Sequence, residues 1–578
     1  MEKSAIFHQS NSQYSYFVSD TRAVVILRTK REDSIRSIQV LWNTGHRFCV
    51  EQLAQPMELY GSDLLADYYM AVLDNGDPGY GYIFEITDGD GGLWYYNESG
   101  FSRQMCPERA FEDNFSLVFP NERDIIRPNR RFEGRVFYQI FPERFCRSTD
   151  KANTAYINMD WNTDRPDNEH FAGGDLNGIR EKLPYLQELG IGAIYMTPVH
   201  PSVSAHKYDI DDYFAIDPMF GTMEDFKALV QEAHCRDILI VMDLVFNHSS
   251  FLNPLFQDVV RKGRESRYYH WYYVDGDKPE WDKRNYKTFS DVAMMPKLNT
   301  NNPEVQEYLT RVGEFYLAEC KVDGFRLDVA FDVSHDFWRF FKKRLQRIDP
   351  QVYLIGEDWQ NSYAFLGNDQ WDSVMNYPFL YACRRYLAED RYDADGFVSF
   401  LTGVLMRYED GTNRNMLNLL DSHDIHRFFT LLQEDVNRQL MAQGALIFYL
   451  GSPMLYYGDE VFMTGGQDPL NRRPMEWNSP RFVSEEHAFL KKLLALLRRV
   501  EMDRGKTAAA EDELRYGDIR LYPRSGVACI RRSYQGRVLT LALNHSGAEQ
   551  SLPEGKLLFG RRVQDGRMEN DSLAVLEG

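Results

Sequence analysis

The pattern of apolar and polar residues changes character twice along this chain. From residue 1 to about residue 125, short runs alternate between apolar and polar side chains and end at turn-forming residues. Runs 23–28, 37–42 and 81–86 are predicted strands, and the last is followed by a turn rich in Gly and Asp. Short strands at this spacing are typical of a β-sandwich, so we predict an N-terminal β-sandwich over residues 1–128.

The second pattern, from about residue 135, alternates continuous apolar runs with stretches of helical periodicity. The predicted strands are 136–141, 191–198, 238–246, 324–329, 352–356, 373–377, 416–420 and 445–450. Helices between them are predicted at 183–189, 223–233, 305–319 and 336–347. Eight buried parallel strands joined by crossover helices form a (β/α)8 TIM barrel, so we predict an α/β fold with the barrel over residues 129–504.

Two further segments complete the predicted domain organisation. The connection 249–302 is rich in Trp and Tyr, and a loop of that length inside a compact domain is usually functional or a small subdomain. We therefore predict an inserted subdomain there. After a predicted helix at 485–500, the chain returns to short alternating strands, which predicts a C-terminal β-sandwich over residues 505–578.

Charge and cysteine content narrow the functional classes. The 578 residues carry a net charge of −20, which argues against nucleic acid and anionic membranes as partners and fits a neutral substrate. No apolar run is long enough to span a membrane, and the N-terminus lacks the apolar core of a signal peptide. The seven cysteines include no CxxC pair, which predicts reduced thiols in a cytoplasmic protein without a zinc site.

Ionisable residues gather at the carboxyl ends of four predicted strands. They are Asp243 and His248 after the third strand, Arg326 and Asp328 on the fourth, Glu357 after the fifth, and His423 and Asp424 after the seventh. The active sites of such barrels lie at the carboxyl-terminal rim. Each residue alone is a common cap or surface residue. Bringing charged side chains from four strand ends together at one rim costs free energy, which indicates that they serve a function.

The order and spacing of these segments resemble a known family. DLVFNH (243–248), GFRLDVA (324–330), GEDW (356–359) and LLDSHD (419–424) look like the four motifs of the alpha-amylase superfamily, glycoside hydrolase family 13. The similarity extends almost continuously from about residue 130 to residue 480. MPKLN (295–299), with LRTKRED, SDLLADYY and YYNESGF in the N-terminal region, is similar to the neopullulanase, cyclomaltodextrinase and maltogenic amylase subfamily.

The resemblance implies a retaining glycoside hydrolase and assigns roles to individual residues. Asp328 resembles the nucleophile, Glu357 the general acid/base, and Asp424 the third acid, which stabilises the transition state. The residues that resemble substrate-binding positions are Tyr208, His248, Arg326, Trp359, His423, Asp468 and Arg472. Arg326 lies two residues before Asp328 on the same strand face and is expected to keep it ionised, while burial keeps Glu357 protonated.

The resemblance also implies substrates and an assembly. The implied substrates are cyclomaltodextrins, maltooligosaccharides and pullulan, cleaved at α-1,4-glucosidic bonds, with α-1,6 bonds as a second bond type. The subfamily further implies a homodimer in which the N-terminal domain of one subunit covers the active site of the other. Such an arrangement narrows the cleft and favours short or cyclic substrates.

Three departures from the subfamily concern the acceptor side and the metal. Phe331-Asp332 stands where the family usually has Asn-Glu, and Asp421 stands where it has Gly. Residues 146–150 lack the Asn-Gly-Asp calcium loop. Calcium prefers several oxygen ligands, and Asp175 with Asn153 offers too few, so we expect no cofactor and no metal ligand, with calcium kept as the weaker alternative.

Three alternative functions compete with this interpretation. Within the superfamily the runner-up is an oligo-1,6-glucosidase or an α-glucosidase, although an oligo-1,6-glucosidase normally lacks such an N-terminal domain. In another class, the same acids and histidines are ligands of a metal-dependent barrel hydrolase, but Arg326 would repel a cation among them. The third is a catalytically silent sugar-binding protein on the same fold, against which both reacting carboxylates are present.

Overall fold

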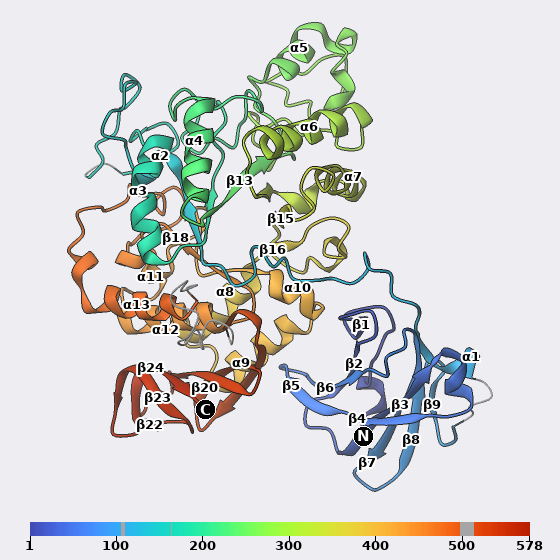
Figure 1. Cartoon of the computed structure of the whole chain (residues 1–578). Coiled ribbons are helices and arrows are strands. Elements are labelled where there is room, and N and C mark those ends of the chain that lie inside the picture. The colour runs from blue at the N-terminus through green and yellow to red at the C-terminus, as the bar shows by residue number, and fades with distance from the viewer. Residues whose placement is uncertain (106–109, 163–164, 498–513) are drawn as a thin grey trace.

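The N-terminal part of the chain forms two antiparallel sheets (Figure 1). The computed structural model describes residues 1–105, 110–162, 165–497 and 514–578. One sheet has the order β1-β2-β6-β5 and the other β4-β3-β7-β8-β9, with β10 paired to β7. The strands are β1 (Ser15–Phe17), β2 (Ala23–Lys30), β3 (Ile35–Thr44), β4 (Leu53–Pro56), β5 (Glu58–Ser62), β6 (Ala66–Leu73), β7 (Tyr80–Asp88), β8 (Leu93–Asn97), β9 (Gly100–Ser102) and β10 (Phe115–Leu117). The predicted two-sheet region is therefore confirmed.

Alternation of side chains along these strands builds the core between the two sheets. Every second residue of a strand points to the same face. Val25 and Leu27 of β2 share a buried cluster with Val40 of β3 and with Phe84 and Ile86 of β7. The apolar face of each sheet is thereby removed from water.

The central part is a closed barrel of eight parallel strands. They are β11 (Phe137–Ile140), β12 (Ala193–Met196), β13 (Leu239–Val245), β14 (Gly324–Asp328), β15 (Tyr353–Gly356), β16 (Ser373–Asn376), β17 (Leu417–Leu419) and β18 (Ser452–Tyr456). Each strand pairs in parallel with the next, and β11 pairs with β18 to close the barrel. The predicted α/β fold class is confirmed, and seven of the eight predicted strands overlap an observed one.

The prediction of the eighth strand at residues 445–450 is wrong. These residues form the end of α12 (Val436–Phe448) and the turn that follows it, and β18 begins only at Ser452. The carboxyl-terminal half of α12 is buried on all sides. A continuous apolar run does not distinguish a buried helix from a buried strand, because neither has a polar face. Gly451, with a φ of 115°, makes the turn between the helix and the strand.

Helices surround the barrel. They are α2 (Pro142–Phe145), α3 (Leu176–Leu189), α4 (Met223–His234), α6 (Pro303–Glu319), α7 (His335–Leu345), α8 (Tyr377–Cys383), α9 (Ala394–Leu405), α10 (Asp410–Asn415), α11 (Phe428–Leu431), α12 and α13 (Glu485–Ala495). The four predicted crossover helices are confirmed as α3, α4, α6 and α7. Helix α3 begins seven residues before its predicted start, because Asp175 caps it by accepting the Gly178 N–H at 2.6 Å.

The long connection after β13 folds back on the strand end that it leaves. It contains α5 (Pro254–Lys262) and short helical turns at Gly263–Glu265 and Tyr269–Trp271. Isolated backbone bridges join His248 to Lys297 and Tyr272 to Leu298. The last residues of this connection are thereby held next to the carboxyl end of β13, which is the predicted active rim.

The C-terminal region is all-β, as predicted. Its strands are β19 (Asp518–Arg524), β20 (Val527–Tyr534), β21 (Arg537–Asn544), β22 (Gln550–Ser551), β23 (Lys556–Gln564) and β24 (Arg567–Glu577). Among the described residues they form one connected antiparallel sheet rather than the two sheets of a sandwich, because β22 and β23 both pair with β24. The predicted boundary at residues 504 and 505 and the end of the predicted helix 485–500 lie outside the described residues.

The N-terminal sheets contact other parts of the same chain. Arg31 pairs with Asp395 of α9 at 2.7 Å, and the Tyr60 hydroxyl donates to the carbonyl of Ile519 in β19 at 3.2 Å. In the described parts of the chain, none of the helices is long and apolar enough to cross a membrane. Six of the seven cysteines are described and carry free thiols, and Cys106 lies outside the described residues.

Candidate active site

One buried guanidinium lies among the strand ends that the sequence singled out. Arg326 of β14 donates through Nη1 to Asp243 at 3.0 Å and to Asp328 at 2.8 Å. Its Nη2 lies 3.0 Å from Oε2 of Glu357 and 3.9 Å from Oδ2 of Asp424. Neighbouring parallel strands bring their carboxyl ends to the same rim, which explains why these side chains meet. Four carboxyl groups thus surround this one guanidinium.

The pKa values of two carboxyl groups in this cluster are raised, first by burial and then by the neighbouring carboxylates. Burial raises the pKa of Asp328 and the pKa of Glu357, and nearby carboxylates add to the effect while Arg326 opposes it. The expectation that Arg326 keeps Asp328 charged is therefore too simple, because several carboxyl groups share the guanidinium. Strongly interacting carboxyl groups titrate as a pair, so Asp328 and Glu357 together retain a proton at pH values where ordinary carboxyl groups have lost theirs.

Glu357 is held by donors at both of its oxygens. The N–H of Val329 donates to Oε2 at 2.8 Å, and the indole N–H of Trp359 donates to Oε1 at 3.1 Å. Val329 has a φ of 45°, which is a left-handed conformation that is rare for a β-branched residue. Trp359 is stacked on Tyr377 with ring centroids 4.0 Å apart. The carboxyl group of Glu357 therefore has a fixed orientation toward Asp328.

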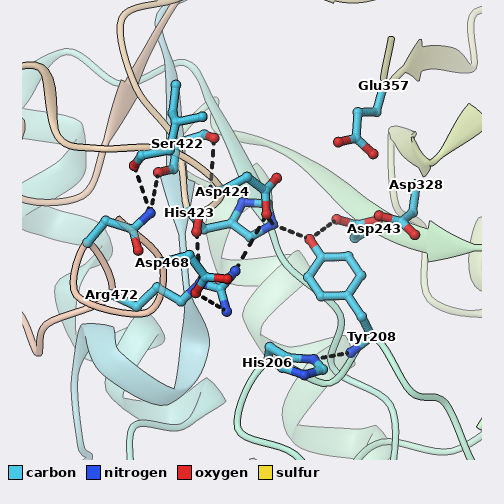
Figure 2. A network of polar contacts seen from close by, with 12 residues as sticks. His206, Tyr208, Asp243, Asp328, Glu357, Ser422, His423, Asp424, Asp468 and Arg472 are labelled. Atoms are coloured by element: carbon cyan, nitrogen blue, oxygen red, sulfur yellow. Dashed lines mark hydrogen bonds and ion pairs between the residues drawn. The ribbon is translucent and has the colours of Figure 1, made fainter. Parts of the chain in front are cut away.

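A chain of hydrogen bonds runs behind the carboxyl cluster (Figure 2). The amide of Gln139 donates to Nδ1 of His423 at 2.6 Å, which leaves Nε2–H of His423 as the donor to the Tyr208 hydroxyl at 2.6 Å. The Tyr208 hydroxyl in turn donates to Oδ2 of Asp243 at 2.8 Å. Burial holds the pKa of His423 well below its usual value, so the imidazole is neutral. The chain fixes the ring of Tyr208 in place.

Arg472 joins the seventh strand end to the segment after β18. Its Nε donates to the carbonyl of His423 at 2.8 Å, and its Nη2 lies 3.5 Å from Oδ1 of Asp424. Its Nη1 forms an ion pair with Asp468 at 2.9 Å, as Figure 2 shows. Asp424 is therefore held from one side by Arg472, while its other side remains open to the cavity described below.

Aromatic and apolar residues complete the surroundings of the carboxyl cluster. His248 stacks on Phe289 with ring centroids 5.0 Å apart, and burial lowers the pKa of His248 to about 3. Its Nε2 has no hydrogen-bond partner among the described residues. Phe331 has 49% of its surface exposed although it is a large apolar side chain. A neutral imidazole with a free nitrogen and an exposed phenyl ring both suit contact with a sugar.

These side chains enclose a cavity of about 320 Å³. It is lined by Asn168, His206, Tyr208, His248, Phe289, Met295, Asp328, Val329, Phe331, Glu357, Trp359, Asp424, Asp468 and Arg472. Eight of the ten residues predicted for the site are in this lining. The other two, Arg326 and His423, lie behind it and are fully buried.

Six lining residues were not predicted as site residues. His206 lies two residues before Tyr208, and this proximity in the sequence is a signal that could have revealed it. In the structure its Nδ1 accepts the N–H of Tyr208 at 3.1 Å. Phe289 and Met295 come from the long connection, whose path the sequence pattern did not reveal. A larger hollow of about 700 Å³ is lined by Trp161, Arg473 and their neighbours and includes none of the catalytic candidates.

The described residues around the expected calcium loop do not fit a metal ion. Among the described residues, no group of three or more His, Cys, Asp and Glu side chains is arranged to hold one. At the position of the family's calcium loop, Oδ2 of Asp175 accepts from the Ser148 hydroxyl at 2.9 Å and from the ammonium of Lys151 at 3.0 Å. Lys151 also donates to the carbonyl of Met219 at 2.7 Å. A lysine ammonium in this position would repel a calcium ion.

Comparison with known proteins agrees with this geometry. The alpha amylase catalytic domain family matches residues 139–493, and the alpha amylase N-terminal ig-like domain family matches residues 1–121. A cyclomaltodextrinase from Thermoanaerobacter pseudethanolicus is 37% identical, over 95% of this chain and 94% of that protein. Neopullulanase 2 from Thermoactinomyces vulgaris is 37% identical over 95% of this chain and 92% of that protein.

A solved structure agrees over the whole length. A cyclomaltodextrinase structure superposes with a TM-score of 0.88 at 30% sequence identity and covers 100% of this chain and 98% of its own. The matched families, the full-length relatives and the shared architecture all lead to one assignment. The chain belongs to the alpha-amylase family and is a hydrolase of that family.

Proposed function

We propose that the protein is a retaining glycoside hydrolase in which Asp328 is the nucleophile and Glu357 is the general acid/base. The observation that supports this most strongly is that both carboxyl groups contact one guanidinium, Arg326, in the wall of a sugar-sized cavity. Retaining hydrolysis needs two carboxyl groups close together on either side of the bond, one to attack and one to move a proton.

The two displacements use the single proton that the pair retains. In the first, Asp328 attacks the anomeric carbon while Glu357 gives its proton to the leaving oxygen, so the carbon–oxygen bond breaks and a glycosyl ester forms. In the second, Glu357 takes a proton from water, which attacks the same carbon and releases Asp328. Atoms and charges balance over the cycle, and the starting configuration is restored.

Three further residues support the transition state in this proposal. The carboxylate of Asp424 faces the cavity and stabilises the positive charge that develops on the sugar ring. The free Nε2 of His248 binds a hydroxyl of the same sugar, and the ring of Tyr208 forms its stacking platform. Asp468 and Arg472 grip the adjacent sugar through their fixed ion pair.

The proposed substrates are cyclomaltodextrins, maltooligosaccharides and pullulan, cleaved at α-1,4 bonds and also at α-1,6 bonds. The names of the full-length relatives, cyclomaltodextrinase and neopullulanase, support this choice. The oligo-1,6-glucosidase alternative has no comparable support, because the N-terminal family is matched here. Arg326 within the carboxyl cluster disfavours the metal-dependent alternative.

The proposal also includes a cytoplasmic homodimer. Free thiols at the six described cysteines support a reducing compartment. Exposed apolar side chains on the N-terminal region, including Val50, Val118 and Phe119, support an interface there. The competing possibility is that the N-terminal region serves only its own chain through contacts such as Arg31 with Asp395, and light scattering at micromolar concentration distinguishes the two.

A product profile combined with stereochemistry tests the activity. The purified enzyme is given β-cyclodextrin, maltotriose, pullulan, starch and isomaltose in parallel, and NMR follows the first product formed. We expect cyclodextrin and maltotriose to be cleaved faster than starch, with the α anomer released first. Initial release of the β anomer would overturn the assigned roles, and faster cleavage of starch would overturn the proposed substrate class.

A further inference from the structure

Two buried carboxyl groups, those of Asp421 and Asp459, lie within hydrogen-bond reach of each other behind the loop that carries His423 and Asp424. Asp421 follows β17 and Asp459 follows β18, and 1% and 5% of their surfaces are exposed. Oδ2 of Asp421 accepts the N–H of Phe428 at 2.8 Å, and Oδ2 of Asp459 accepts the N–H of Tyr456 at 2.9 Å. In the described structure the other oxygen of Asp421 is buried without any N–H donor.

In the described part of the chain, one cation, Arg427, faces this pair. Arg427 is fully buried, and its Nη1 donates to the carbonyl of Tyr457 at 2.8 Å while lying 3.5 Å from Oδ1 of Asp459. Its Nε donates to the carbonyl of Asn471 at 3.1 Å. The guanidinium is therefore engaged mainly with carbonyls and supplies one positive charge. Two buried carboxylates against one guanidinium would leave a buried negative charge uncompensated, which is strongly destabilising.

We propose that Asp421 and Asp459 share one proton, and that this pair, balanced by Arg427, positions the loop that presents His423 and Asp424. In this arrangement protonated Asp459 donates its O–H to the free oxygen of Asp421. The pair then carries one negative charge, which Arg427 neutralises. The catalytic consequence rests on the function proposed above, whereas the shared proton itself does not.

The electrostatic surroundings agree with this assignment. Burial raises the pKa of Asp421, and burial together with the nearby Asp421 raises the pKa of Asp459 well above its usual value. Among the described residues, the charged group that faces the pair is Arg427, which precedes α11, and its guanidinium lies 4.3 and 4.9 Å from the ring centroids of Tyr456 and Tyr457. Two like charges in contact cannot both be ionised at low cost, so one proton is retained.

The loop is fixed at several points around this pair. Asp421 accepts a hydrogen bond from the N–H of Phe428. The side-chain amide of Asn471 donates to the carbonyl of Ser422 at 3.1 Å and to the carbonyl of Ile425 at 2.8 Å. The N–H of Arg427 donates to the carbonyl of Gly465 at 3.1 Å. The pair and its guanidinium thus connect the loop of Asp424 to the segment that carries Asp468 and Arg472.

Asp421 and Asp459 act on the reaction only through other residues. Neither is part of the cavity lining, so they are positioning residues rather than catalytic ones. Oδ2 of Asp421 accepts the N–H of Phe428, and an apolar side chain at this position would offer no acceptor. The carboxyl group of Asp421, with the proposed shared proton, is therefore part of the structure that supports the loop after β17.

Single amide substitutions test the shared proton directly. In Asp459→Asn the new amide N–H replaces the shared proton, and in Asp421→Asn the amide donates to Asp459, which can then ionise. Either variant keeps one hydrogen bond and one negative charge for Arg427. We expect both to keep kcat on β-cyclodextrin within about threefold of wild type, less than the loss of one buried hydrogen bond would cost.

The double variant removes the charge as well. With Asn at both positions, Arg427 is left without a carboxylate, and we expect kcat to fall by at least about tenfold, as for a buried ion that loses its partner. Circular dichroism shows whether this variant folds. If it does not, the single variants still decide the proposal, and a single variant that falls as far as the double variant overturns it.

The pH dependence of stability provides a readout that does not need a substrate. The shared proton is bound in the folded state above the pH at which an unfolded Asp loses it, so its stabilising effect is lost as pH rises through the raised pKa. The free energy of unfolding of wild type, minus that of Asp459→Asn, should therefore decrease with rising pH. Asp369→Asn, at a half-exposed ion pair with Arg339, is the matched control and should show no such decrease.

The outcomes separate this proposal from the proposed function. A flat stability difference between about pH 5 and about pH 9 shows that no proton is shared and overturns the inference. If the stability difference falls with pH but the wild type cleaves none of the glucans, the proposed function fails while the shared proton stands. A decreasing stability difference together with active single variants supports both parts.

Discussion

Two sets of residues that line the same cavity are built in different ways. The polar set, Tyr208, Asp424, Asp468 and Arg472, lies in a network in which most members have two or more partners. The apolar set, Phe289, Met295 and Phe331, comes from the long connection after β13 and from the short helix after β14. Phe331 is about half exposed, whereas Tyr208 is almost completely buried.

The difference suggests a division of labour. Hydrogen bonds and ion pairs with fixed geometry allow little movement, so the polar set suits the part of the reaction in which charge develops at one atom. Apolar contacts are less directional, so the apolar set can accept sugars of different linkage. We therefore expect changes near the carboxyl cluster to abolish the reaction, and changes in the apolar set to redirect it.

The largest effect is expected at the reacting carboxyl groups. Asp328→Asn removes the proposed nucleophile, and Glu357→Gln removes the proton that the proposed general acid gives to the leaving oxygen. General acid/base catalysis contributes about 10²–10⁴-fold, and loss of the covalent route should cost at least as much. Both variants should keep the wild-type circular dichroism spectrum, and kcat is measured on maltotriose. An Asp328→Asn enzyme with a near wild-type rate would show that the roles are wrongly assigned.

The next largest effect is expected in the polar set. Asp424→Asn keeps the shape of the side chain but removes the negative charge that faces the cavity. Loss of one electrostatic contact to a transition state typically costs about 10²–10³-fold in kcat. We expect kcat to fall by this amount with a much smaller change in KM. A change confined to KM would place Asp424 in ground-state binding and would weaken the proposed contrast between the two sets.

The strand ends in the sequence were sufficient to bring the two proposed reacting carboxyl groups together, whereas Tyr208, Asp468 and Arg472 of the polar set came from the family resemblance. Asp328 and Glu357 lie on or directly after strands, and the barrel fold places all strand ends on one rim. Phe289 and Met295 could not be predicted in this way, because they reach the cavity only through the path of a long connection. The raised pKa of Asp328 could not be predicted from the sequence either, because it depends on burial and on how many carboxyl groups surround Arg326.

A pH effect of intermediate size is expected from the proton held by Asp328 and Glu357. Their pKa values are raised, and the first step requires that proton on Glu357. Activity should therefore persist at pH values above the ordinary carboxyl range and fall as pH rises through the raised pKa, by about tenfold per pH unit. The measurement is kcat/KM on maltotriose against pH. Activity that falls already through the ordinary carboxyl range would contradict the retained proton.

The smallest effect is expected in the apolar set, and it should appear in the products rather than in the rate. Phe331→Asn replaces the exposed ring with a small polar side chain, the residue that the family resemblance implies at this position. Contacts between aromatic rings contribute about 0.5–1.5 kcal/mol, and we expect a contribution of similar size from a sugar stacked on this ring. Without the ring, the preference for a sugar acceptor over water should fall roughly two- to tenfold. The ratio of transfer to hydrolysis products from maltotriose, measured by chromatography, should fall accordingly, while kcat for hydrolysis changes by less than about threefold.

Phe7→Asn, at a similarly exposed ring in the N-terminal region, is the control and should leave the product ratio unchanged. An unchanged ratio in Phe331→Asn would mean that this ring does not contact the acceptor, and that the apolar set does not redirect the reaction.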